Sequence, residues 1–142
     1  MQEIRQDNEI LVGYRLENEV EIDTLDLSIN TYLNGVVRQD ITERVGKDDG
    51  DKFIIGYIIA EELIDDLRNG IRVLASEPEF YIAKVSLQYF LNFFEYSARE
   101  KVMSIASKEL GVSEDMFVMH AITGLKMLRQ LPKFEEEGKT ID

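Results

Sequence analysis

Histidine is the residue that general acid–base catalysis and metal binding recruit most often, and the chain contains one, His120. Its neighbours along a helix, among them Met116 and Thr123, offer neither a carboxylate to orient the ring nor a second metal ligand. The chain has no cysteine and no HExxH motif, which removes thiolate chemistry and the common zinc sites. We therefore predict a structural or partly exposed histidine.

Carboxylates could act as a general acid and a general base if two of them faced each other. Two pairs stand close together in the sequence, Glu61 with Glu62 and Asp65 with Asp66. Helical spacing places both pairs opposite Leu63 and Leu67, on a face that points into water. These residues are therefore predicted to form a solvated acidic face.

Three further aspartates surround Gly50: Asp48, Asp49 and Asp51. A calcium loop of the EF-hand type needs oxygen ligands at alternate positions before its glycine, and Val45 and Gly46 break that spacing. The segment predicts a hairpin turn centred on Asp49 and Gly50, with a metal loop as the alternative.

Motifs that cradle phosphate or present a nucleophile are absent from the sequence, which contains no GxxxxGK[ST], GxGxxG or GxSxG segment. We therefore assign no catalytic residue, no cofactor and no metal ligand. A protein that acts by binding is favoured over an enzyme.

The densest aromatic segment, residues 80–96, has two apolar sides if it is helical. One side belongs to the core, and the other carries Tyr89, Phe93 and Tyr96. This second side either packs under the apolar loop 71–75 or meets a partner, because Tyr and Phe are enriched in interfaces. The three aromatic residues are the predicted anchor for a partner.

The first sixty residues, which must help to position these side chains, contain segments with the two-residue period of strands. Residues 10–15 predict one strand. Residues 25–33 alternate apolar and polar side chains up to Asn34 and Gly35, a pair that favours a tight hairpin. Pairing with residues 36–45 requires a β-bulge between Val36 and Ile41. Residues 53–60 are apolar on both faces and predict the central strand.

The second half of the chain has helical spacing with clear end signals. Helices are predicted to begin at Ser76 and Ser113 and to end at Gly70, Gly111 and Pro132. The apolar stripe that starts at Phe80 is too long for one straight helix, so a break is predicted at a second capping box, residues 97–100. The last helix is predicted to bury Phe117, Ala121, Leu125 and Leu128.

The predicted fold class is α+β, with an antiparallel sheet in the N-terminal half packed by C-terminal helices. Residues 1–132 are predicted to form a single domain, and residues 133–142 an acidic C-terminal tail.

Part of this pattern resembles the GNAT acyltransferase superfamily, as represented in some bacterial and phage proteins. The resemblance covers the alternating hairpin 25–45, the segment 53–58 and the helix 61–70, about a third of the chain. That superfamily holds the acetyl-CoA pyrophosphate on a Q/R-x-x-G-x-G/A loop. The best-placed segment here, residues 129–134, has Pro132 and Phe134 where the glycines belong. The resemblance implies a related scaffold without the acetyl-CoA site.

Charge narrows the range of partners. The 142 residues include 28 Asp and Glu against 16 Lys and Arg, a net charge of −12, which argues against binding nucleic acid or an anionic membrane. No apolar run is long enough to span a membrane, and the absence of cysteine fits the cytoplasm.

We expect a cytoplasmic acidic module that binds a basic protein surface, of the immunity-protein, phage-encoded inhibitor or adaptor type. A GNAT-like acyltransferase relative and a structural homo-oligomer subunit, such as a homodimer, are the alternatives. The predicted partner-binding residues are Tyr89, Phe93, Tyr96, Asp48, Asp49, Asp51, Glu61, Glu62, Asp65 and Asp66.

Overall fold

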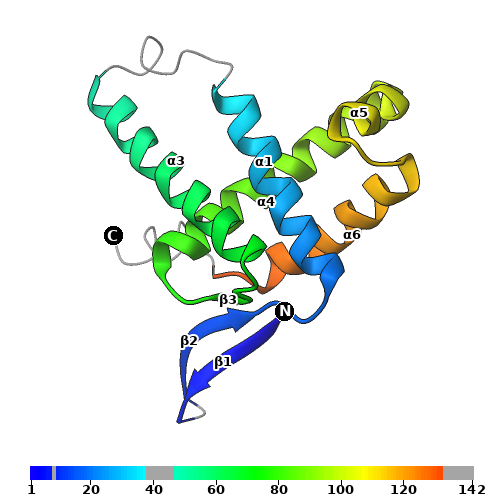
Figure 1. The fold of residues 1–142 in the computed structure, drawn as a ribbon. Coiled ribbons are helices and arrows are strands. Elements are labelled where there is room, and N and C mark those ends of the chain that lie inside the picture. Colours follow the sequence, from blue (N-terminus) through cyan, green and yellow to red (C-terminus); the bar gives the residue numbers. More distant parts are fainter. Residues whose placement is uncertain (8, 38–46, 133–142) are drawn as a thin grey trace.

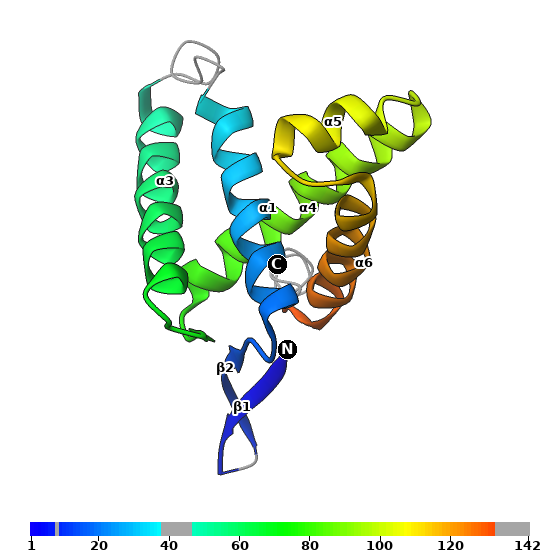
Figure 2. The same ribbon diagram turned by 45° about the vertical axis from the view of Figure 1, so that its right-hand side comes forward.

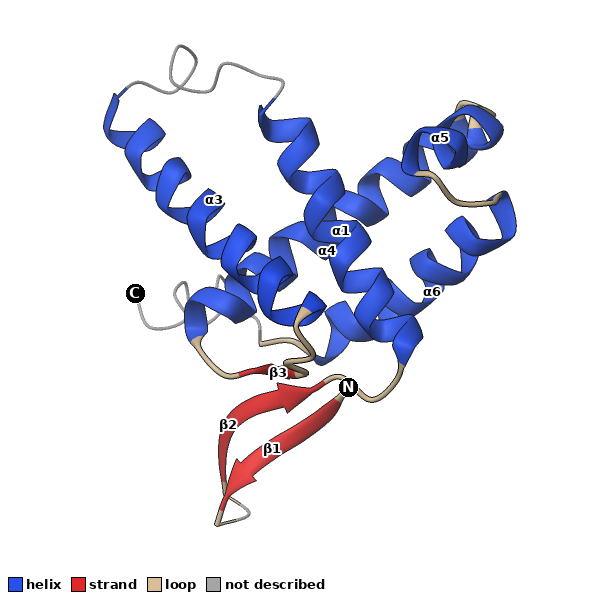
Figure 3. Cartoon of the chain, in the orientation of Figure 1, coloured by secondary structure: helices blue, strands red, loops and turns tan. Residues whose placement is uncertain are grey.

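The fold is known from a computed structural model, which describes residues 1–7, 9–37 and 47–132, without the side chains of residues 36, 37 and 47–55. Its elements, in chain order, are β1 (Gln2–Gln6), β2 (Ile10–Arg15), α1 (Glu19–Val37), α3 (Lys47–Arg68), β3 (Val73–Leu74), α4 (Glu77–Arg99), α5 (Met103–Leu110) and α6 (Glu114–Gln130) (Figures 1 and 3). The α+β class, with an antiparallel sheet in the N-terminal part followed by helices, is confirmed. The tail predicted for residues 133–142 lies outside the described residues.

The sheet is small and antiparallel, with the strand order β1-β2-β3. β1 and β2 form a hairpin that extends away from the helices (Figure 2). β3 adds only two residues, with Leu74 opposite Tyr14 of β2. The Tyr14 hydroxyl donates a hydrogen bond to the Gln130 carbonyl at 2.7 Å, which ties the sheet to the end of α6. The strand predicted at residues 10–15 is confirmed, whereas β1 and β3 were not predicted.

The strand predicted at residues 25–33 is wrong, because these residues belong to α1. Leu25 and Ile29 recur every four residues, a spacing that fits a helix as well as a strand. Ser28, one of the polar residues that the strand would place in water, is fully buried, as is Thr24 just before the segment. The Ser28 hydroxyl donates to the Thr24 carbonyl at 2.6 Å, so the helix itself satisfies a buried hydroxyl.

The hairpin predicted at Asn34 and Gly35 is wrong for the same reason, since both residues lie within α1. The proposed bulge between Val36 and Ile41 depended on that hairpin. Its second strand falls mostly on residues 38–46, which lie outside the described part of the chain.

The central strand predicted at residues 53–60 and the turn predicted around Gly50 are also wrong, because both segments belong to α3. A run that is apolar on all sides suits a helix covered by other helices as well as a central strand. From residue 56 onward the spacing of buried residues is helical, as Ala60, Leu63 and Leu67 are buried while Ile58 is 51% exposed.

α4 is the central helix and packs against α1, α3, α5 and α6 (Figures 1 and 2). One core cluster joins α4 to α1, α3 and the sheet, with Tyr14 and Phe80 in edge-to-face contact at 5.5 Å. A second, aromatic cluster joins α4 to α5 and α6 around Phe90 and Phe117. Leu125, which was predicted to lie in this core, is instead 39% exposed. Because α6 packs against both α1 and α4, its buried face is turned toward Gly124 and Met127.

The predicted helix starts are confirmed by their hydrogen bonds. The Ser76 hydroxyl accepts from the Glu79 amide at 3.3 Å. The Glu79 carboxylate accepts from the amide of Ala75 at 3.0 Å, so the return bond of the predicted capping box goes to the residue before the N-cap. Ser113 accepts from the Met116 amide at 3.1 Å. These caps depend on residues next to each other in the chain, which is why spacing alone identifies them.

Three helices end in one hydrogen-bond pattern, the Schellman motif. In each helix, a backbone amide beyond the last turn donates to a carbonyl five residues earlier. The pairs are Ile71 to Asp66 in α3 (2.9 Å), Val102 to Ser97 in α4 (2.9 Å) and Val112 to Ser107 in α5 (3.0 Å). Gly70 and Gly111 occupy the left-handed position in α3 and α5, as predicted, with φ of 90° and 76°. In α4 that position is held by Lys101, with φ of 58°.

The predicted break in the long C-terminal stripe is confirmed between α4 and α5. Its predicted cause is wrong. The Ser97 hydroxyl donates to the Phe93 carbonyl at 2.8 Å within α4 and caps no new helix. The chain turns because Lys101 adopts the left-handed conformation.

Candidate functional site

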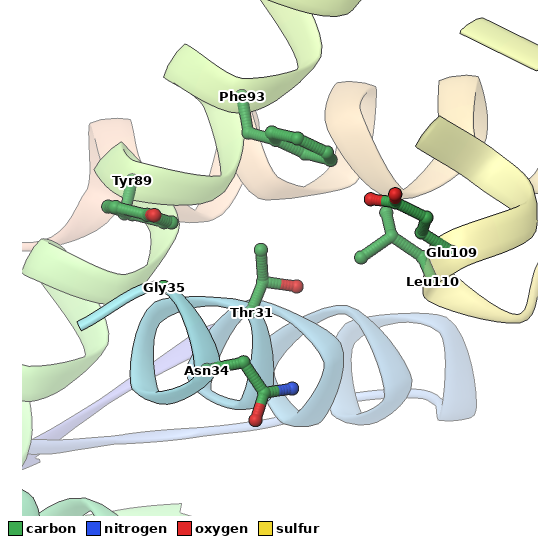
Figure 4. Close-up of a pocket in the computed structure, with 7 residues that line it drawn as sticks. All are labelled: Thr31, Asn34, Gly35, Tyr89, Phe93, Glu109 and Leu110. Carbon is green, nitrogen blue, oxygen red and sulfur yellow. The ribbon is translucent and has the colours of Figure 1, made fainter. Parts of the chain in front are cut away.

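A pocket of about 150 Å³ lies between α1, α4 and α5 (Figure 4). Its lining comes from the C-terminal part of α1, the middle of α4 and the end of α5, and consists of Thr31, Asn34, Gly35, Tyr89, Phe93, Glu109 and Leu110. These residues are far apart in the sequence, so the site exists only in the folded chain.

A glycine on α1 creates the room for the aromatic wall. The Tyr89 hydroxyl lies so close to Gly35 that a β-carbon at that position would overlap it. The Tyr89 ring meets Tyr32 edge to face, with centroids 5.8 Å apart. The centroid of the Phe93 ring lies 6.0 Å from that of the Phe117 ring in the aromatic core. Contacts to α1 and α6 thus hold both rings of the wall in place.

The polar part of the lining carries one charge, that of Glu109. Its side chain is exposed and has no hydrogen-bond or ion-pair partner among the described residues. The Thr31 hydroxyl, by contrast, is used within α1, where it donates to the Leu27 carbonyl at 2.7 Å. Figure 4 shows the Glu109 carboxylate and the Phe93 ring on neighbouring sides of the pocket. A pocket lined by an unpaired carboxylate and aromatic rings suits a cationic ligand group.

The structure brings two of the three predicted aromatic anchors together. Tyr89 and Phe93 are half-buried and line the pocket, and α1 covers them rather than the loop 71–75. Tyr96 does not line the pocket; it is 52% exposed, and the Arg99 guanidinium lies 6.0 Å from its ring centroid.

The predicted acidic residues lie on a different helix from the pocket. Glu61, Glu62 and Asp65 are exposed on α3 and Asp66 is half-buried. Asp48, Asp49 and Asp51 belong to the first turns of α3, and their side chains lie outside the described set. No described side chain of α3 lines the pocket, so Glu61, Glu62, Asp65 and Asp66 can act on a ligand there only through long-range attraction.

The sequence-based prediction missed Glu109, Thr31 and Asn34. The signal that could have found Thr31 and Asn34 is the neighbouring Gly35, because a glycine inside an apolar helical pattern marks a close approach by another side chain. That signal was interpreted as a hairpin turn. No local pattern points to Glu109.

His120 is buried, with 3% exposed, and its Nδ1 lies 2.7 Å from the Thr24 hydroxyl. Burial lowers the pKa of His120, and the nearby Asp23 carboxylate opposes this shift. The ring therefore acts as a neutral link between α6 and α1. In the described part of the chain, no three His, Asp or Glu side chains gather in a way that could hold a metal ion.

Comparison with protein-family models, with curated proteins and with solved structures finds no match. Among the described residues, no helix has the length and apolar character needed to cross a membrane.

Proposed function

We propose that this protein acts by binding a protein with a basic surface, and that the pocket receives an arginine or lysine side chain of that partner. The observation that carries the proposal is the unpaired carboxylate of Glu109 in a pocket that Tyr89 and Phe93 also line, with Phe93 on the neighbouring side (Figure 4). A guanidinium or ammonium group there would meet an anion and aromatic faces together. The role is that of an immunity protein, an inhibitor or an adaptor.

Size and charge support the same ligand class. A cavity of this size takes a group about as large as benzene, which is comparable to the end of an arginine side chain. The net charge of −12 attracts a cationic surface and repels an anionic one. The exposed acids of α3 add to this attraction at a distance.

We do not extend the GNAT resemblance into a proposed acyltransferase activity. Much of the resemblance depended on strands at residues 25–33 and 53–58, and these residues lie in helices α1 and α3.

The direct test is an NMR titration with N-acetyl-arginine methylamide, with the citrulline analogue as the neutral control of matching shape. We expect saturable binding with shift changes at Tyr89, Phe93 and Glu109. The citrulline analogue should bind about tenfold more weakly, since a cation–π contact and an exposed ion pair together contribute about 1 to 2 kcal/mol. Equal binding of the two compounds, or shifts away from the pocket, would contradict the proposal.

Two variants distinguish binding at the pocket from nonspecific attraction to an acidic protein. Glu109→Gln should weaken binding of the arginine compound by about three- to fivefold, less than the citrulline replacement does, because it removes the ion pair and leaves the cation–π contact. Glu62→Gln removes a carboxylate of α3 that is also exposed, and it should change the affinity by less than about twofold, because long-range attraction to a small ligand is screened. Similar losses in both variants would argue for nonspecific attraction.

With a protein partner, charge and aromatic contacts should affect different rate constants. Replacing Glu61, Glu62 and Asp65 by the corresponding amides should slow association and reduce its salt dependence. Phe93→Ala should mainly speed dissociation, because it removes part of the pocket wall. An association rate that does not change with salt in the unmodified protein would contradict the electrostatic part of the proposal.

A further inference from the structure

α6 carries a row of apolar side chains that the described elements leave partly exposed. Val118, Ile122 and Leu125 are 38%, 53% and 39% exposed. The opposite side of the helix, which includes Phe117 and Gly124, is buried against α4 and α1. Figure 2 shows α6 at the edge of the group of helices. The row is separate from the pocket, whose lining contains no residue of α6.

Opposite charges stand at the two ends of this row. Glu114 lies in the first turn of α6 and Arg129 in the last. With helical geometry, Glu114, the three apolar residues and Arg129 fall within a sector of about 80° around the helix axis. Neither charged side chain has an ion-pair partner among the described residues.

This arrangement is complementary to itself when two copies of α6 run antiparallel. Val118 of one copy then lies opposite Leu125 of the other, and Glu114 lies opposite Arg129, because both pairs have the same midpoint in the sequence. Ile122 lies next to that midpoint, beside the two-fold axis. A parallel arrangement would instead place like charges together.

We infer that this face of α6 binds a second copy of the chain in an antiparallel, two-fold symmetric pair. A two-fold interface requires one surface patch that matches itself, and the apolar row with opposite charges at its ends meets this requirement. The occupant follows from the charge pattern, since a partner helix must offer a positive group where this one offers Glu114 and a negative group where it offers Arg129. The face is small and each copy carries a net charge of −12, so the pair should be weak and should strengthen as salt screens the repulsion.

The test is sedimentation equilibrium of the full chain at physiological salt, up to about 1 mM protein. We expect a reversible rise of the average mass toward that of a dimer. Ile122→Gln should weaken the association at least tenfold. The control is Ile105→Gln, which removes an isoleucine of α5 that is 63% exposed and lies outside the row, and it should leave the association unchanged.

Charge reversal gives a result that misfolding cannot imitate. Glu114→Arg and Arg129→Glu should each weaken the pair at least threefold, and the variant that carries both changes should regain most of the loss because the opposite charges face each other again. Circular dichroism checks that each variant is folded. A chain that stays monomeric up to the highest concentration, a double reversal without recovery, or an equal loss in Ile105→Gln would overturn the inference.

Discussion

Two glycines of this protein differ in whether the atoms around them leave room for a β-carbon. A β-carbon at Gly13 would lie 2.5 Å from the Leu74 carbonyl oxygen, a backbone atom of β3 that cannot move without breaking the strand pair. A β-carbon at Gly124 would meet Leu87 Cδ2 at 3.4 Å and Thr24 Cγ2 at 3.5 Å, which are ordinary contacts between side chains.

We therefore predict opposite signs for two alanine substitutions. Gly13→Ala should lower the free energy of unfolding by about 1 to 3 kcal/mol through overpacking. Gly124→Ala should raise it by about 0.5 to 1 kcal/mol, because alanine restricts the unfolded chain and favours the helix. Urea unfolding of the two variants checks this, and changes of the same sign would contradict the proposed difference in packing between the two glycines.

His120 gives a prediction about pH. Burial lowers the pKa of its imidazole below the unfolded value of about 6.5, so the unfolded chain binds a proton more readily than the folded one. Stability from this residue is fully present above about pH 6.5 and is lost as the pH falls from there toward the folded pKa. Unfolding should therefore become easier between about pH 7 and pH 5.5, before most carboxylates titrate.

The matched control is His120→Gln, which keeps a group able to bond to Thr24 but has no proton to gain in this range. Its unfolding free energy should depend less on pH than that of the unmodified chain over the same interval. Parallel curves for the two proteins would rule out His120 as the source.

At the scale of elements, the three Schellman ends form a natural comparison, because two of them use glycine and one uses lysine. A side chain in the left-handed region costs about 1 kcal/mol or more. Lys101→Gly should therefore raise the free energy of unfolding by up to about 1 kcal/mol, while Gly111→Ala should lower it by about 1 kcal/mol. Thermal unfolding measures both, and a destabilised Lys101→Gly would mean that the lysine side chain contributes more than its backbone strain costs.

At the scale of the whole molecule, the excess of 28 acids over 16 bases sets the response to salt. Repulsion between distant carboxylates acts over about 30 Å at 10 mM salt and over about 8 Å at 150 mM. Exposed ion pairs such as Arg68 with Asp26, at 3.3 Å, weaken with salt, but each contributes at most about 1 kcal/mol. We predict that the free energy of unfolding increases from 10 to about 150 mM sodium chloride, because the repulsion outweighs these few pairs.

Denaturant unfolding in urea, which is uncharged, measures this dependence at a protein concentration too low for self-association. Potassium chloride should give the same increase, since screening depends on ionic strength and not on the cation. Stability that is flat or falls with salt would show that attractive pairs dominate.

The sequence by itself determined features that depend on neighbouring residues. Ser76 and Ser113 cap helices, Gly70 and Gly111 end them, and the stripe that begins at Phe80 is the buried face of α4, because caps and helical periods involve residues within one or two turns. The strand at residues 10–15 followed from the same kind of local pattern. Tyr89 and Phe93 were identified as a second apolar side of α4 for this reason. The α+β class is confirmed, but the other strands of the sheet were predicted at segments that are helical.

Only the tertiary structure decided the conformation of residues 19–37 and 47–60 and the identity of the pocket. The alternation from Leu25 to Leu33 suits a strand, but Ser28 can be buried in a helix through its bond to the Thr24 carbonyl, and Thr24 in turn meets His120 of α6. That partner is 96 residues away in the sequence, and no local period reports it. Glu109 joined the site for the same physical reason, since the packing of α1, α4 and α5, and not spacing along the chain, places its carboxylate beside Phe93.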